Sequence, residues 1–160
     1  MIIIACVDDN LGLLFNNRRQ SRDGILIKDI LDFIGNKILW INTYSKQLFP
    51  EQENIIVSEN FIDEANEGDF CFIEDIDVKK YVDKIEKIIL YFWNREYPAD
   101  RKFDINLDDW ILTHEKDFEG SSHEKITQKI YIRRNEGWEE VIKQKRKLKH
   151  KPGLRFRSLL

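Results

Sequence analysis

The sequence begins Met1-Ile-Ile-Ile-Ala-Cys-Val7, an uninterrupted apolar run, and then becomes polar from Asp8 to Gly12. A short apolar run followed by turn-forming residues predicts a buried β-strand over residues 1–8. Residues 16–23 then read Asn-Asn-Arg-Arg-Gln-Ser-Arg-Asp. Ligands of open α/β sheets bind beyond the carboxyl ends of the strands, so we expect this arginine loop to lie near a binding site.

The composition predicts one domain without a membrane partner. The 160 residues are 42% hydrophobic, which is enough for a single sizeable core. Apolar stretches such as residues 88–93 are far shorter than the roughly 18 residues of a membrane helix, and no secretory signal precedes the first strand. We therefore expect a cytoplasmic protein. Cys6 and Cys71 lie in apolar runs, which favours small buried side chains over a disulfide or a metal site.

Apolar spacing predicts alternating strands and helices, and hence a mostly parallel central sheet with helices on both faces. The later segments around Gly120 alternate apolar and polar residues, which predicts a closing antiparallel hairpin. Strands are predicted over residues 1–8, 37–41, 54–58, 69–73, 87–93, 110–115 and 126–133, and helices over 25–34, 44–49 and 78–85.

Charge is distributed unevenly along the chain. After Glu140 there are eight basic residues and no acidic one, whereas the preceding residues hold all 29 acidic residues and 18 basic ones. Clustered Lys and Arg suit a nucleic-acid backbone, although such a tail also serves solubility. We therefore divide the chain into an α/β domain over residues 1–135 and a basic C-terminal tail over residues 136–160, with RNA as a partner the tail would suit.

Several segments, in order, resemble those of dihydrofolate reductases. Residues 1–12 are similar to the family's opening strand and its Val-Asp-x-x-x-Gly turn, and residues 36–43 are similar to its Asn-Lys strand and the helix start that follows. Further similar segments are residues 54–58, 87–91, 103–110 and 130–134. The resemblance spans roughly 130 positions and implies a dihydrofolate reductase-like α/β fold.

The resemblance fails where that family binds its substrate and cofactor. The Leu-Pro-Trp wall against the substrate is replaced by Arg19-Gln20-Ser21, and the substrate-binding acid falls near Leu26 unless Asp23 or Asp29 replaces it. The glycines that admit the cofactor pyrophosphate become Glu74-Asp75, whose carboxylates would repel it. We expect a divergent member that binds no such cofactor and is not a functional dihydrofolate reductase. The residues do not indicate whether another reaction is catalysed.

The resemblance also implies that three loops meet at one cleft: residues 16–23, 93–100 and 121–124. Arginine forks bind phosphate or carboxylate, and aromatic rings stack on bases. We predict an anionic small ligand there, a nucleotide or a phosphorylated metabolite. The predicted ligand-binding residues are Arg18, Arg19, Gln20, Arg22, Asp23, Trp93, Arg95, Tyr97, Asp100, His123 and Glu124.

Each of these residues also has a structural interpretation. The three arginines of the first loop would pair with acidic residues of the neighbouring loops and pin them together. Asp23 would cap the following helix, and Trp93 would lie in the core. His123 would be a solvated histidine of an exposed turn rather than a general base. The acidic partners considered are Glu96, Asp100 and Glu124.

Two acidic pairs, Asp8-Asp9 and Glu74-Asp75, keep a nuclease alternative open. Both follow predicted strands, where they would chelate Mg²⁺ with waters or simply begin turns. Small bacterial proteins with a similar Arg-Arg-Gln-Ser loop carry the label ribonuclease Z, but that enzyme needs a His-x-His-x-Asp-His motif for two zinc ions. This chain has only 3 histidines, widely separated, so we do not adopt the label. The alternative function is an RNA-binding protein or a metal-dependent ribonuclease that uses the acidic pairs and the basic tail.

Overall fold

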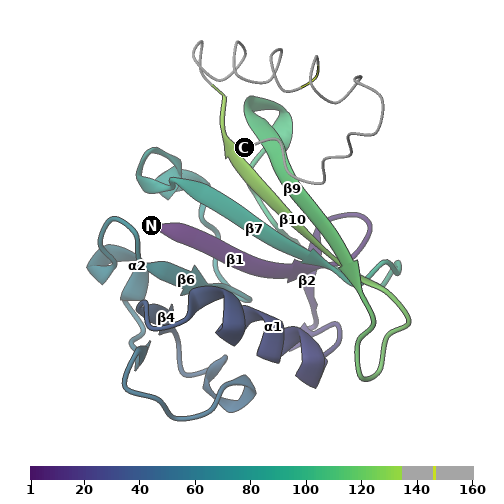
Figure 1. The fold of residues 1–160 in the computed structure, drawn as a ribbon, viewed down its shortest axis with the longest axis horizontal. Coiled ribbons are helices and arrows are strands. Elements are labelled where there is room, and N and C mark those ends of the chain that lie inside the picture. Colours follow the sequence, from purple (N-terminus) through teal and green to yellow (C-terminus); the bar gives the residue numbers. More distant parts are fainter. Residues whose placement is uncertain (135–145, 147–160) are drawn as a thin grey trace.

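Figure 1 shows a computed structural model of the chain, which describes residues 1–134 and residue 146. Its central element is a seven-stranded sheet with the strand order β5-β4-β6-β1-β7-β10-β9. The strands are β1 (Ile2–Val7), β4 (Leu39–Ile41), β5 (Ile55–Val57), β6 (Phe70–Phe72), β7 (Lys87–Phe92), β9 (Trp110–Phe118) and β10 (Ile126–Arg133). The predicted tail, residues 136–160, lies outside the described residues apart from residue 146, so the division into a domain and a tail stays a prediction.

The sheet is parallel except for its last two strands. β1 pairs in parallel with β6 and β7, and β4 pairs in parallel with β5 and β6. β10 runs antiparallel to both β7 and β9. Strands β9 and β10 form a long hairpin at one edge of the sheet (Figure 1). The predicted mostly parallel sheet with a C-terminal antiparallel hairpin is therefore confirmed.

Both faces of the parallel strands are buried, which explains why their sequences do not alternate. Along β1, Ile3 and Ala5 pack into one apolar core, whereas Ile2 and Ile4 pack into another on the opposite face. Helix α1 (Gly24–Ile34) covers the second core with Leu26, Ile30 and Ile34. The short helix α2 (Phe61–Glu64) covers the first core with Phe61 and Ile62. Helices thus lie on both faces, as predicted.

Helix α1 begins after Asp23, the cap that the sequence suggested, and ends before Gly35. Asp23 precedes it in an extended conformation, and its carboxylate accepts the N–H groups of Ile25 and Leu26. Gly35 follows it with a φ of 57°, and its own N–H donates to Leu31 O. A side chain at this left-handed position would be strained, so glycine is the suitable terminator.

The other predicted helices are shorter than expected. Residues 44–49 contain only the 3₁₀ turn η1 (Lys46–Leu48), and residues 78–85 form the 3₁₀ segment η2 (Lys79–Lys84) rather than an α-helix. Helix α2 was not predicted. Each segment is anchored by a few apolar side chains, such as Val78 and Ile85 around η2, and this spacing does not distinguish a 3₁₀ helix from an α-helix.

A second, three-stranded sheet replaces part of the predicted arginine loop. It has the order β3-β2-β8 and comprises β2 (Gly12–Phe15), β3 (Arg18–Arg19) and β8 (Arg101–Lys102). Asn16 and Asn17 connect β2 to β3 with φ values of 51° and 58°. Positive φ at both central residues is typical of a tight hairpin turn, and asparagine tolerates it well. The expectation of an irregular loop over residues 16–23 is therefore wrong for its first half.

Both cysteines are unpaired. Cys71 is fully buried in β6, and Cys6 is half-buried in β1. Burial raises the pKa of the Cys71 thiol to about 12, so it is an inert apolar side chain, as predicted. Among the described residues, none of the helices has the length and apolar character needed to span a bilayer.

Candidate functional site

The three predicted loops contact one another beyond the carboxyl ends of β1 and β7. Gln20 donates through Nε2 to Pro98 O at 3.4 Å, which joins the first loop to the second. Ser21 Oγ lies 2.9 Å from His123 Nε2, which joins the first loop to the turn of the β9–β10 hairpin. The region beyond the strand ends is thus built by residues that are far apart in the sequence.

Asp8 holds the first two loops together. It is fully buried at the end of β1, and its Oδ1 accepts the N–H groups of Gly12 at 2.7 Å and Asn10 at 2.9 Å. Its Oδ2 accepts the N–H of Tyr97 at 3.0 Å and Gln20 Nε2 at 3.2 Å. Burial raises the pKa of Asp8, but these backbone donors more than offset that effect, and the pKa lies below its ordinary value. Asp8 is therefore an ionised organiser of the loops.

Arg19 is held by a carboxylate that the sequence assigned to a different role. Its Nε donates to Glu74 Oε2 at 2.8 Å and its Nη2 donates to Glu74 Oε1 at 3.0 Å, a fork on a carboxylate. Its guanidinium also lies 4.5 Å from the ring centroid of Tyr44, and Ser45 Oγ donates to Glu74 at 2.8 Å. Pairing of Arg19 with an acid of the neighbouring loops is therefore wrong. Its guanidinium instead forms an ion pair with Glu74, which follows β6.

Asp23 organises a second group of polar side chains, which we call the Asp23–His123 cluster: Ser21, Asp23, Ser121, Ser122 and His123. The Asp23 carboxylate accepts the N–H groups of Leu26, Ser121 and Ser122 at 3.2, 3.0 and 2.9 Å. Burial raises the pKa of Asp23, but the hydrogen bonds from Ser122, His123 and the other donors lower it well below its usual range. Asp23 therefore caps α1, as its structural interpretation predicted, and also binds the hairpin turn.

His123 is buried, with 6% of its surface exposed, so its assignment to a solvated turn is wrong. Its Nδ1 lies 2.9 Å from Asp23 Oδ2, and its ring stacks on Trp93 with centroids 4.6 Å apart and planes at 29°. Trp93 is itself buried, in agreement with its structural interpretation. The sequence could not place His123 because the residues that bury it come from other loops.

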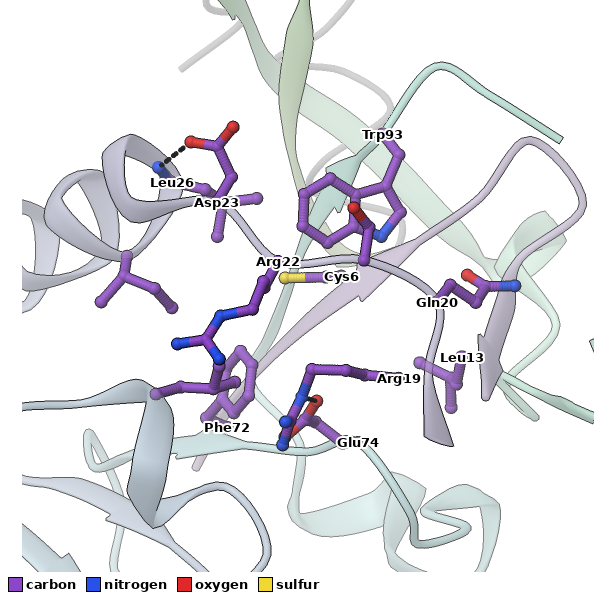
Figure 2. Close-up of a pocket in the computed structure, with 13 residues that line it drawn as sticks. Cys6, Leu13, Arg19, Gln20, Arg22, Asp23, Leu26, Phe72, Glu74 and Trp93 are labelled. Atoms are coloured by element: carbon purple, nitrogen blue, oxygen red, sulfur yellow. Dashed lines mark hydrogen bonds and ion pairs between the residues drawn. The ribbon is translucent and has the colours of Figure 1, made fainter. Parts of the chain in front are cut away.

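An inner cavity lies beside this cluster, between β1, β6 and α1 (Figure 2). It leaves only about 20 Å³ open to the centres of water molecules, which is room for one or two waters. Figure 2 shows Arg22 and Trp93 among its walls, with Arg19 turned to Glu74 at one end. Most of its other walls are apolar: Cys6, Leu13, Leu26, Ile27, Leu48 and Phe72.

An outer groove lies on the other side of β3 and is far larger, about 530 Å³. It runs between the β2–β3 hairpin and the loop that follows β7. Arg18 and Tyr97 lie across it, and neither is buried. It is lined by Phe15, Asn16, Arg18, Arg19, Gln20, Tyr97 and Pro98. Sequence reasoning missed Phe15 and Asn16; the Asn-Asn pair was the available signal for a hairpin here.

The remaining predicted site residues line neither space. Arg95, Asp100 and Glu124 are exposed, and none of them borders the inner cavity or the outer groove. Asp100 instead accepts the N–H of Asn16 at 3.0 Å and so supports the hairpin turn. The predicted single cleft is therefore two separate spaces, because β3 and the side chain of Arg19 divide it.

The acidic pairs do not form a metal cluster. Within the described part of the chain, no group of three or more His, Cys, Asp or Glu side chains is arranged to hold an ion. Asp75 accepts Asn42 Nδ2 at 2.8 Å, while its neighbour Glu74 is held by Arg19 and Ser45. Both Glu74 oxygens and Asp75 Oδ1 therefore accept hydrogen bonds from protein donors.

Comparison with known proteins identifies the fold. No protein-family model and no curated protein sequence matches the chain. Among solved structures, dihydrofolate reductase from Enterococcus faecalis, complexed with NADP(H) and RAB-propyl, is similar to it with a TM-score of 0.61 and 10% sequence identity. The match covers 84% of this chain and 96% of that chain. The chain thus has a dihydrofolate reductase-like fold with a divergent sequence, as its segments predicted.

Proposed function

We propose that this protein binds a small anionic ligand, a nucleotide or a phosphorylated metabolite, in the outer groove, and that it does not reduce dihydrofolate. The observation that carries the proposal is the pairing of an exposed guanidinium with an exposed and a half-buried aromatic ring around a space of about 530 Å³. Pockets for small ligands commonly have volumes of several hundred cubic ångströms.

Arg18 supplies the charge for this site. It is exposed, and among the described residues no carboxylate forms an ion pair with it, whereas the adjacent Arg19 is committed to Glu74. Phe15 lies directly opposite Arg18 in the β2–β3 ladder and is 43% exposed. Tyr97 lines the facing wall. A ligand with a phosphate and a flat ring would use the fork of Arg18 and cover these rings.

The residues present do not fit the reductase's own ligands. Glu74 and Asp75 follow β6 where the resemblance places the glycines for a cofactor pyrophosphate, and two carboxylates there oppose a dianionic group. The candidate substrate-binding acids are also engaged. Asp23 caps α1, and Asp29 accepts Tyr91 Oη at 2.7 Å and pairs with Lys116 at 2.6 Å. We therefore derive no step through a nicotinamide cofactor.

A thermal-shift screen followed by calorimetry would test the proposal, with AMP, ADP, GDP, glucose 6-phosphate and inorganic phosphate as probes. We expect at least one probe to raise the melting temperature. Arg18→Ala should weaken its binding about tenfold, because a charge-assisted fork is lost. Lys28→Ala removes a positive charge from the exposed side of α1 and is the matched control. Absence of any shift, or equal binding by the Arg18 variant, would reject the site.

RNA binding through the basic tail is the second candidate, supported by the absence of acidic residues after Glu140. Deleting residues 141–160 should then abolish binding of a single-stranded RNA and its salt dependence, while Arg18→Ala should leave it unchanged. We do not extend this candidate to a metal-dependent ribonuclease, because Glu74 and Asp75 are hydrogen-bonded to Arg19, Ser45 and Asn42.

A further inference from the structure

Three side chains of the Asp23–His123 cluster lie in a hydrogen-bonded series that ends at the inner cavity. Asp23 Oδ2 is 2.9 Å from His123 Nδ1, and His123 Nε2 is 2.9 Å from Ser21 Oγ. Asp23 and His123 are buried, whereas Ser21 is half-buried and lines the cavity. This order is that of an activated serine nucleophile: a buried carboxylate, then an imidazole, then an accessible hydroxyl.

The surroundings of Asp23 determine where the protons lie. Backbone N–H groups of Ile25, Leu26, Ser121 and Ser122 all point at its two oxygens, so the carboxylate is ionised and can only accept. The Nδ1 atom of His123 therefore carries the proton that faces Asp23. In the neutral imidazole, Nε2 is then the acceptor and takes the hydrogen bond of the Ser21 hydroxyl.

The anchoring role of Asp23 does not require Ser21. The backbone donors already satisfy the carboxylate, and together with the hydroxyls of Ser121 and Ser122 they join α1 to the hairpin turn. Trp93 stacks on the imidazole and fixes the ring plane. Ser21 adds a hydroxyl on the cavity side of the ring, where most of the other walls are apolar. This placement presents a hydroxyl to a bound molecule and adds nothing to the anchoring of α1.

We propose that Ser21 is a nucleophile activated by His123 and oriented by Asp23, and that this site hydrolyses esters of short-chain carboxylic acids. The inner cavity beside Ser21 has mostly apolar walls, so the acyl group that it accepts would be short and apolar. Arg22 lines the same cavity, and its guanidinium has no carboxylate partner within the described chain. It would stabilise the negative charge that develops on the carbonyl oxygen.

The reaction proceeds in two balanced halves. Ser21 Oγ bonds to the ester carbon while its proton passes to His123 Nε2; the carbon–oxygen bond to the alcohol then breaks, and the alcohol leaves with that proton. Water next attacks the acyl carbon and gives a proton to Nε2. The bond to Ser21 Oγ then breaks, and the serine recovers the proton as the acid departs. No group is oxidised or reduced, and water is the only co-reactant.

The test uses the whole chain, a fluorophosphonate probe and p-nitrophenyl acetate. We expect one probe molecule per chain, located by peptide mapping on Ser21, together with acetate release. Ser21→Ala should lose both while keeping its melting temperature. His123→Asn should slow both about 100-fold or more, because the asparagine amide can still donate to Asp23 but supplies no base. Labelling in urea provides the unfolded reference.

No labelling of the folded protein, or equal labelling of the folded and urea-unfolded chains, would overturn the proposal even if the asparagine variant did not fold. Equal rates for a folded His123→Asn variant would also overturn it. Lys28→Ala should leave fluorophosphonate labelling unchanged, since Lys28 is exposed on α1 and lines neither the inner cavity nor the outer groove.

Discussion

Arg18 and Arg19 are neighbours in a two-residue strand, yet they belong to different environments. Arg19 faces inward, where it grips Glu74 and covers Tyr44, and its side chain is only 15% exposed. Arg18 faces the outer groove and is exposed. Successive side chains of a strand point to opposite faces, so one extended segment supplies both a structural arginine and a free one.

The same contrast separates the two spaces around them. The inner cavity is narrow. Although Arg22 on its wall has no carboxylate partner among the described residues, the carboxylates beside the cavity, Glu74 and Asp23, are satisfied by protein donors. The outer groove is wide and contains a charge without a protein counterion among the described residues. Satisfied buried groups stabilise a fold, whereas unsatisfied exposed ones are available to a ligand.

Replacing Asp23 should have the largest effect. Asp23→Ala leaves the N–H groups of Leu26, Ser121 and Ser122 without their acceptor and removes the partner of His123. We expect the free energy of unfolding to fall by about 3–5 kcal/mol, in the range for a broken buried charge network. Urea unfolding followed by circular dichroism would measure it. A loss below about 1 kcal/mol would mean that the inner region does not depend on this carboxylate.

Acid should lower the free energy of unfolding by protonating Asp23. The pKa of Asp23 is lower in the folded chain than in the unfolded chain, so the unfolded state binds the proton more readily. The stability that Asp23 contributes is therefore complete above the unfolded pKa of about 3.9 and is lost as the pH falls toward the folded value. Unfolding free energies from pH 7 to pH 2 should fall mainly below about pH 4, and Asp23→Ala should flatten the curve there. An equally steep curve for the variant would assign acid sensitivity to other groups.

Adjacent arginines should respond differently to the same substitution. Arg19→Ala leaves Glu74 in a largely buried position with Ser45 as its remaining side-chain donor, and we expect a loss of about 2–4 kcal/mol in unfolding free energy. Arg18→Ala should change that quantity by less than about 0.5 kcal/mol, as for other exposed positions. Parallel urea titrations of the two variants would compare them. Similar losses would contradict the separation of the two faces.

Removing the aromatic ring of the outer groove should have the smallest effect. Phe15→Ala is expected to weaken nucleotide binding by about 0.5–1.5 kcal/mol, since one stacking surface is lost, while inorganic phosphate should bind as before. Calorimetry with ADP and phosphate would separate the two contributions. Equal weakening of both probes would show that Phe15 shapes the hairpin instead of stacking on a ring.

The fold was largely predictable because its parallel strands are apolar on both faces and helix α1 has clear termini. The β1 run, the Asp23 cap and the Gly35 terminator each follow from local chemistry. The small sheet was not predicted, because β3 and β8 contain only two residues each. Such short strands carry no periodicity, and β8 pairs with β2 from far along the chain.

The sequence predicted the location of the site but not the role of each residue in it. The arginine loop, Tyr97 and His123 do gather beyond the strand ends, but the role of each depends on contacts from elsewhere. Glu74 determines that Arg19 is structural, and Asp23 determines that His123 is buried. Ser21 was missed because a hydroxyl gains reactivity only from an imidazole placed 102 residues away in the sequence.

The amino-acid sequence by itself determined the buried parallel strands, the cap of α1 and the presence of an arginine-rich segment after β1. Burial of apolar runs and local hydrogen bonding are encoded within a few residues of one another. Which arginine is free, which carboxylates are occupied, and that one expected cleft is two follow only from the folded structure. These outcomes depend on partners separated by 29 residues or more, as Ser45 is from Glu74, and their pairing exists only once the chain has folded.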